Sequence, residues 1–96
     1  MSEDDSYRQS IQKQLAKLEE SINIDAILDH LFQEKVINRE QLEQLEAYKM
    51  HEGHTFAVRT LLQLVIGKHV SVKQFMKVVG QQLRWVREMI EGGAEV

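Results

Sequence analysis

Cysteine and proline are both absent from this chain of 96 residues, and glycine occurs only five times. Without cysteine the chain can form no disulfide, thiolate nucleophile or cysteine-based zinc site, which fits a reducing, intracellular environment. The glycines are scattered or terminal, so neither the G-x-x-x-x-G-K-[ST] nor the G-x-G-x-x-G pattern occurs and nucleotide binding has no support. These absences remove several classes of enzyme and of disulfide-stabilised domain.

Strong positive charge and long apolar runs are also missing. The formal net charge is −3, which lacks the basic field that non-specific nucleic-acid binding uses. No apolar run approaches the length that spans a bilayer, and the acidic start (Glu3, Asp4, Asp5) is unlike a secretory signal. We therefore expect neither nucleic acid nor membrane as a partner and place the chain in the cytoplasm, with the nucleus as the alternative.

The composition that remains is that of one ordinary globular domain. Hydrophobic residues make up 43% of the chain and charged residues 28%, a balance that excludes general disorder. The length suits a single domain with one core. We expect a flexible N-terminus over residues 1–6, a single interaction domain over residues 7–91 and a flexible tail over residues 92–96.

Apolar residues recur at helical spacing, and strand-like alternation is weak, so the predicted fold class is all-α. Ser6 is the expected N-cap of the first helix and Ser71 that of the fifth, and Gly67 is the expected left-handed terminator of the fourth. Gly80 is the only local signal for a break between the fifth and sixth helices. We predict helices over 7–21, 24–34, from 39 to the turn at 51–54, 55–66 and from 72 onward, the last two helices being separate or almost continuous.

The beginning of the third predicted helix has the clearest boundary signal. Asn38 is placed as N-cap with Gln41 three residues later, which is a capping-box pattern. Ile37 precedes the cap and is positioned to pack onto Leu42. Short connections between helices indicate a compact antiparallel bundle.

Catalytic and metal-binding patterns are weak. His51 and His54 flank Glu52, but the spacing is not H-E-x-x-H and no third ligand is implied, so polar turn residues are the preferred interpretation. No serine stands in a nucleophile-elbow context. We predict no catalytic site, no metal and no cofactor, and we do not expect an enzyme.

Charged residues of opposite sign are predicted on different helices. Each group alone is typical of a solvated helix face. Together they give a surface of two signs that can pair head-to-tail with another copy or a relative. The bases are Lys13, Lys17 and Arg59 on the first and fourth helices, and the acids are Asp25, Asp29, Glu40 and Glu43 on the second and third.

Large apolar side chains are expected to fill the core. Trp85 is the sole tryptophan, and closing the core is a commoner role than anchoring an interface. Phe56, Phe75 and Met76 are likewise predicted to be core residues.

Three segments, read in succession, resemble a known family. They are residues 23–31 (NIDAILDHL), 36–42 (VINREQL) and 58–65 (VRTLLQLV). In order and spacing they are similar to the second, third and fourth helices of the caspase recruitment domain (CARD), a member of the death-fold superfamily. The resemblance covers residues 7–90, although residues 74–91 lack the clear break that the family shows between its last two helices.

The resemblance implies a six-helix antiparallel bundle that associates with other CARDs, in a caspase, an adaptor or a sensor, or with itself. Such modules assemble signalling complexes in apoptosis and in innate-immune, inflammasome-type pathways. In several members a basic patch on the first and fourth helices meets an acidic patch on the second and third. Arg59 occupies the basic position of the fourth helix and Asp29 an acidic position of the second; the other five charged residues match by face alone.

Two alternatives stay open at this stage. A CARD-only decoy inhibitor is suggested because Met1 begins the chain and Val96 ends it. A helical nucleic-acid-binding regulatory domain is the outside alternative, weakened by the acidic balance. The related death-effector domain stays a further possibility, although its charged triad is not evident.

Overall fold

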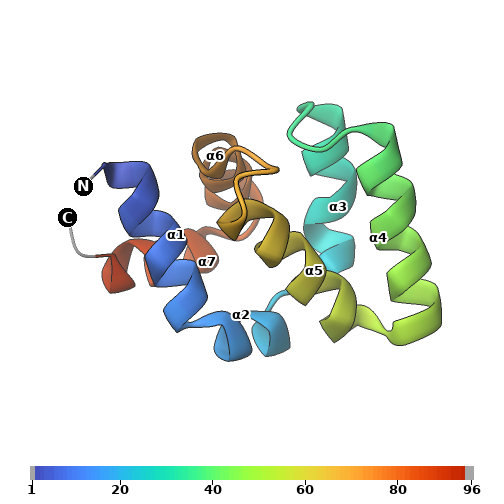
Figure 1. Ribbon diagram of the computed structural model, residues 1–96, viewed down its shortest axis with the longest axis horizontal. Coiled ribbons are helices and arrows are strands. Elements are labelled where there is room, and N and C mark those ends of the chain that lie inside the picture. The colour runs from blue at the N-terminus through green and yellow to red at the C-terminus, as the bar shows by residue number, and fades with distance from the viewer. Residues whose placement is uncertain (1, 95–96) are drawn as a thin grey trace.

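A computed structural model describes residues 2–94, and this part of the chain is a bundle of α-helices without strands (Figure 1). The predicted all-α bundle is therefore confirmed. The radius of gyration over Cα atoms, 12.2 Å, matches the roughly 12.5 Å expected for a compact domain of this length. The helices are α1 (Glu3–Lys13), α2 (Leu15–Ser21), α3 (Ile24–Gln33), α4 (Arg39–Glu52), α5 (His54–Ile66), α6 (Val72–Gln82) and α7 (Arg84–Gly93).

Helix α5 is the centre of the bundle, as its apolar pattern predicts. It packs against α1, α2, α3, α4 and α6. Val58, Leu61, Leu62 and Val65 are fully buried, so more than one face of the helix contributes to the core. The other helices are held around it by one continuous apolar cluster.

Residues 2–94 form seven helices instead of six because the first predicted helix is divided at Gln14, whose backbone has φ −107° and ψ 17°. The Gln14 side chain donates to Ser10 Oγ (3.0 Å) and to the Met89 carbonyl (3.1 Å). Ser10 Oγ in turn donates to the Ile90 carbonyl at 2.6 Å. The bend is thus fixed by bonds to α7, more than seventy residues away, and not by a local proline or glycine.

The chain becomes helical earlier than predicted. Helix α1 begins at Glu3, and its N-cap is Ser2, whose side chain accepts from the Asp5 N–H. Ser6, the predicted cap, is instead buried inside α1. The acidic first turn suits the positive end of the helix dipole. Of the predicted flexible N-terminus, Met1 lies outside the described residues.

The last two helices are separate, with the break at Leu83 and not at Gly80. Leu83 has φ −138° and ψ 71°, and its N–H still donates to the Val79 carbonyl at 2.7 Å. Gly80 lies inside α6, where an added Cβ would come within 2.7 Å of Arg87 atoms. The glycine therefore makes room for the Arg87 side chain of α7 against α6.

Two other expected boundaries differ in detail. Gly67 has φ −79°, and the left-handed position after α5 is taken by Lys68 with φ 66°. Lys35 is in the same conformation after α3, with φ 60°. Gly92 and Gly93, placed in the predicted tail, belong to α7, while Glu95 and Val96 lie outside the described residues.

The start of α4 confirms the predicted capping box. Asn38 Oδ1 accepts from the Gln41 N–H (2.7 Å), and Gln41 Oε1 accepts from the Asn38 N–H (2.9 Å). Ile37 is buried and Leu42 is half-buried against the core. Two backbone donors are thereby satisfied where α4 begins.

Candidate interaction surface

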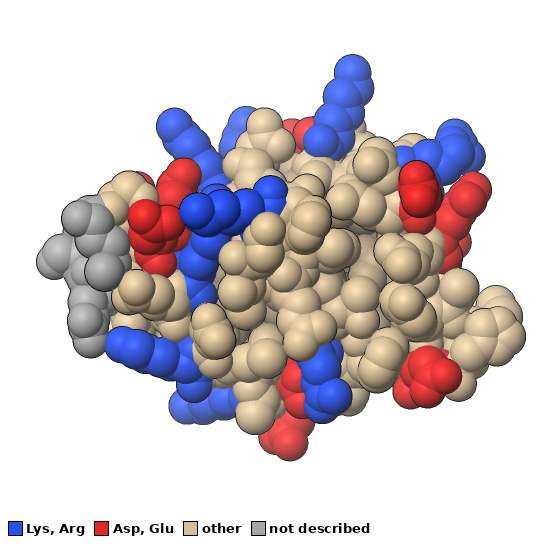
Figure 2. Space-filling view, in the orientation of Figure 1, with Lys and Arg blue, Asp and Glu red and all other residues tan. Residues whose placement is uncertain are grey.

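The predicted charged residues are exposed on two groups of neighbouring helices. Helices α1 and α2 both pack against α5, and α3 packs against α4. In Figure 2 basic and acidic atoms stand mainly around the rim of a broad uncharged area. The basic set is Lys13 on α1, Lys17 on α2 and Arg59 on α5; the acidic set is Asp25 and Asp29 on α3 with Glu40 and Glu43 on α4.

Arg59 makes a bidentate ion pair with Glu19 of α2. Its Nε and Nη2 donate to Glu19 Oε2 and Oε1, each at 2.8 Å. The Glu19 side chain is only 10% exposed, whereas that of Arg59 is 46% exposed. The hydrogen bond from Arg59 lowers the pKa of Glu19, against the opposing effect of burial. Arg59 is therefore exposed as predicted, but part of its charge is used within the molecule.

Glu19 is a residue that the sequence interpretation missed. It lies four residues after Leu15 and three before Ile22, so it falls on the apolar stripe of the first predicted helix. A carboxylate on such a stripe is a signal for a buried ion pair. The identity of the partner, forty positions away, had no comparable signal.

Asp25 joins three helices at the other side of α5. Its Oδ1 accepts from Lys49 Nζ of α4 at 2.6 Å, and its Oδ2 lies 3.2 Å from His54 Nε2 of α5. The hydrogen bond from Lys49 lowers the pKa of Asp25, and the same bond raises the pKa of Lys49. His54, predicted as a turn residue, is instead the first residue of α5 and contacts this carboxylate.

Four of the predicted charged residues differ from Arg59 and Asp25, which are paired within the molecule. Within residues 2–94, no ion pair involves Lys17, Asp29, Glu40 or Glu43. All four are exposed. Arg59 and Asp25 therefore hold helices together, whereas these four charges face solvent.

Two aromatic residues predicted for the core reach the surface. Trp85 on α7 is 44% exposed and Phe56 on α5 is 36% exposed. Phe56 packs edge-to-face on Tyr48 of α4, with ring centroids 5.1 Å apart. Phe75 and Met76 are buried as predicted.

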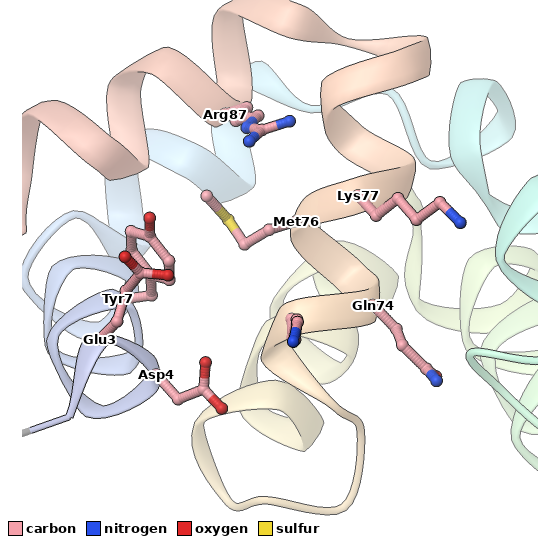
Figure 3. A pocket seen from close by; sticks show the side chains of 8 residues that line it. Glu3, Asp4, Tyr7, Gln74, Met76, Lys77 and Arg87 are labelled. Carbon is pink, nitrogen blue, oxygen red and sulfur yellow. The ribbon is translucent and has the colours of Figure 1, made fainter.

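A hollow of about 560 Å³ lies between α1, α6 and α7 (Figure 3). Tyr7 and Met76 point into it, Arg87 lies at its upper edge, and Lys77 points away. Burial, followed by the charge of Glu3, raises the pKa of Tyr7. Residues 2–94 contain no group of three or more His, Cys, Asp and Glu side chains placed to hold a metal ion. None of the helices described is long and apolar enough to cross a membrane.

A family model matches most of the chain. The family model described as caspase recruitment domain matches residues 3–91, which is almost the whole chain and includes all seven helices up to the last turn of α7. No curated protein and no solved structure matches the chain significantly. The three motifs, the helical bundle and the extent of this match agree. The chain belongs to the caspase recruitment domain family, whose death-fold helical bundle is a protein-interaction domain that binds other CARDs.

Proposed function

We propose that this chain is a non-enzymatic CARD–CARD module that recruits or assembles partners in apoptotic or innate-immune signalling in the cytoplasm. The observation that carries the proposal is the match to the family over residues 3–91, together with bases on α1, α2 and α5 and acids on α3 and α4. The partners would be caspases, adaptors or sensors that contain a CARD, or further copies of this chain. Opposite charge on two faces favours contact between unlike faces.

The solvent-facing charges are the ones available to steer a partner. Lys17 on the basic side and Asp29, Glu40 and Glu43 on the acidic side can form new pairs without breaking one inside the molecule. Exposed charges of this kind raise the rate of association and select orientation. We expect binding through them to weaken as salt is added.

Arg59 keeps a place in the basic face despite its bond to Glu19. A guanidinium has five N–H donors, and two of them are used by Glu19, so three remain for a second acceptor. Glu19 also holds the guanidinium in one orientation, which lowers the entropy that a partner's carboxylate must overcome on binding. Asp25, held by Lys49 and His54, retains its half-exposed carboxylate in the same way.

The test is light scattering of the purified chain over a range of concentration and salt, for wild type, Lys17→Glu and Asp29→Lys. We expect salt-sensitive association that each reversal weakens about tenfold or more, with unchanged helicity by circular dichroism. Arg59→Glu is unsuitable because it places a second carboxylate beside the buried Glu19. Lys73→Glu on the exposed face of α6 is the matched control and should leave association unchanged.

A heterotypic partner is tested in parallel by passing the same four proteins over a panel of immobilised, purified CARDs. Binding of wild type to at least one member, lost in Lys17→Glu or Asp29→Lys and kept in Lys73→Glu, supports the proposal. The proposal is wrong if wild type neither self-associates nor binds any member, or if Lys73→Glu has the same effect as the other two reversals.

A further inference from the structure

Met50 is an apolar side chain on the acidic outer face of α4. It is 79% exposed, more than any other large hydrophobic residue described. Glu43 and Glu46 precede it by seven and four residues, so the three side chains follow one another along the same face of the helix. We call Glu43, Glu46 and Met50 the α4 tip. It is a single methionine with carboxylates on one side.

A hollow of about 510 Å³ lies near the other end of α4, at the turn from α3. We call it the α3–α4 hollow; Phe32 and Ile37 supply its apolar lining, and Lys35 is the only charged residue that lines it. The guanidinium of Arg39 lies over the Phe32 ring, 5.7 Å from its centroid. The hollow is therefore an apolar depression with the bases Lys35 and Arg39 beside it, and the exposed acids Glu34 and Glu40 are their neighbours in the sequence.

We propose that the α4 tip of one copy of this chain binds in the α3–α4 hollow of a second copy. Met50 would enter the depression formed by Phe32 and Ile37, and a methionine adapts well to an irregular apolar site. Glu43 and Glu46 would then face Lys35 and Arg39. Within residues 2–94, no ion pair involves Glu43 or Lys35, so neither group has to leave a partner in its own chain.

The backbone at Lys35 follows from the end of α3, as that at Lys68 follows from the end of α5. Lys35 has φ 60°, a left-handed conformation that costs less with glycine. Its position at the turn keeps a long basic side chain exposed beside the hollow.

The positions of the two surfaces make the contact head-to-tail. Helix α4 has 14 residues and is therefore about 21 Å long, with Met50 in its last turn and the hollow at its first residues. Figure 2 shows basic atoms near the turn between α3 and α4, with acidic atoms beside them along α4, and a further acidic group lower down, near α5. Because the two surfaces differ, each pair leaves one tip and one hollow free, and a line of copies can grow.

This contact rests on the proposed function, since it assumes that the domain associates with its own kind, but it uses different residues. The test is sedimentation velocity on Met50→Asp, which keeps the hollow, and on Lys35→Glu, which keeps the tip. Trp85→Asp is the matched control, because it makes the same type of change at another exposed apolar residue, on α7. Circular dichroism checks that each variant is folded.

We expect wild type and Trp85→Asp to grow in mass with concentration. Each of Met50→Asp and Lys35→Glu should associate at least tenfold more weakly. An equimolar mixture of the two should associate more strongly than either variant alone, because the intact tip of Lys35→Glu fits the intact hollow of Met50→Asp.

Other results would show that the tip does not bind the hollow, and the proposed function can still be tested separately. If the mixture stays monomeric, or if either variant associates like wild type, the tip does not bind the hollow. Loss of association in Lys17→Glu and Asp29→Lys alone would then retain the proposed function without this contact. If wild type is monomeric throughout, the contact is wrong and the panel of CARDs decides the function.

Discussion

Two ion pairs on opposite sides of α5 have the same chemistry and different surroundings. Glu19 and Arg59 are bonded twice at 2.8 Å, and the carboxylate is 10% exposed. Asp25 Oδ1 and Lys49 Nζ are 2.6 Å apart, and the Asp25 side chain is 51% exposed. The shorter pair is the one that water screens more, so distance alone does not rank them. Burial decides what is lost when a partner is removed, because a dry carboxylate cannot return to water.

The largest effect should come from removing the base of the buried pair. Arg59→Ala leaves Glu19 without a donor in a nearly dry position, and we expect the melting temperature to fall by roughly 5–10 °C. Lys49→Ala should lower it by about 2 °C or less, because Asp25 regains water. Thermal denaturation followed by circular dichroism measures both.

A double variant tests whether the lower stability of Arg59→Ala comes from the unpaired charge of Glu19 or from lost packing. Adding Glu19→Gln to Arg59→Ala removes the stranded charge, so the double variant should be more stable than Arg59→Ala alone. If the double variant is less stable than Arg59→Ala, the buried carboxylate is not the source of the loss.

Lowering the pH should reduce stability through both ion pairs, and the size of the loss should distinguish them. The folded pKa of Glu19 is below its ordinary value of 4.5 and that of Asp25 is below 3.8, each chiefly because of the hydrogen bond from its basic partner. The unfolded chain therefore binds more protons in this range, and the stabilisation is complete above about pH 5.5 and is lost as pH falls through the folded pKa values.

Melting temperatures measured from pH 6 to pH 3 test this sign. We expect Glu19→Gln to flatten the profile more than Asp25→Asn does, since the carboxylate of Glu19 is the less exposed. A wild-type protein that becomes more stable on acidification over that interval would contradict the assignment for both groups.

The features of the fold that the sequence predicts correctly are local, and those that it misses depend on contacts between residues far apart in the chain. The capping box of Asn38 and Gln41 lies within four consecutive residues, so its bonds follow from the sequence. The bend at Gln14 depends on the Met89 carbonyl, and nothing near Gln14 signals it. Trp85 was assigned to the core from residue type, but burial is set by how α7 lies on its neighbours.

The charged residues of the site show the same division. Helical spacing was sufficient to place Lys17, Asp29 and Glu43 on exposed faces. It could not show that Arg59 is bonded to Glu19, because that pair forms only when α2 and α5 pack together. The sequence therefore predicted which charged side chains are exposed, but it did not predict which of them are already paired within the molecule.

A smaller effect is expected at the exposed carboxylate itself. Asp25→Asn removes the charge but keeps a side chain that can accept from Lys49, so the melting temperature should change by about 2 °C or less. Helix content should be unchanged, because Asn23 still caps α3. A loss as large as that of Arg59→Ala would mean that burial does not explain the difference between the two pairs.

Salt should give the smallest and most selective change. Between about 0.05 M and about 0.5 M NaCl the Debye length falls to a few ångströms, so interactions among exposed charges are screened. The difference in melting temperature between wild type and Asp25→Asn should shrink toward zero over this range. The difference between wild type and Arg59→Ala should persist, because little of it is Coulombic attraction through water and most is the cost of a dry, unpaired carboxylate. If added salt removes both differences equally, the Glu19 site is accessible to water and ions in solution, and the two pairs differ only in geometry.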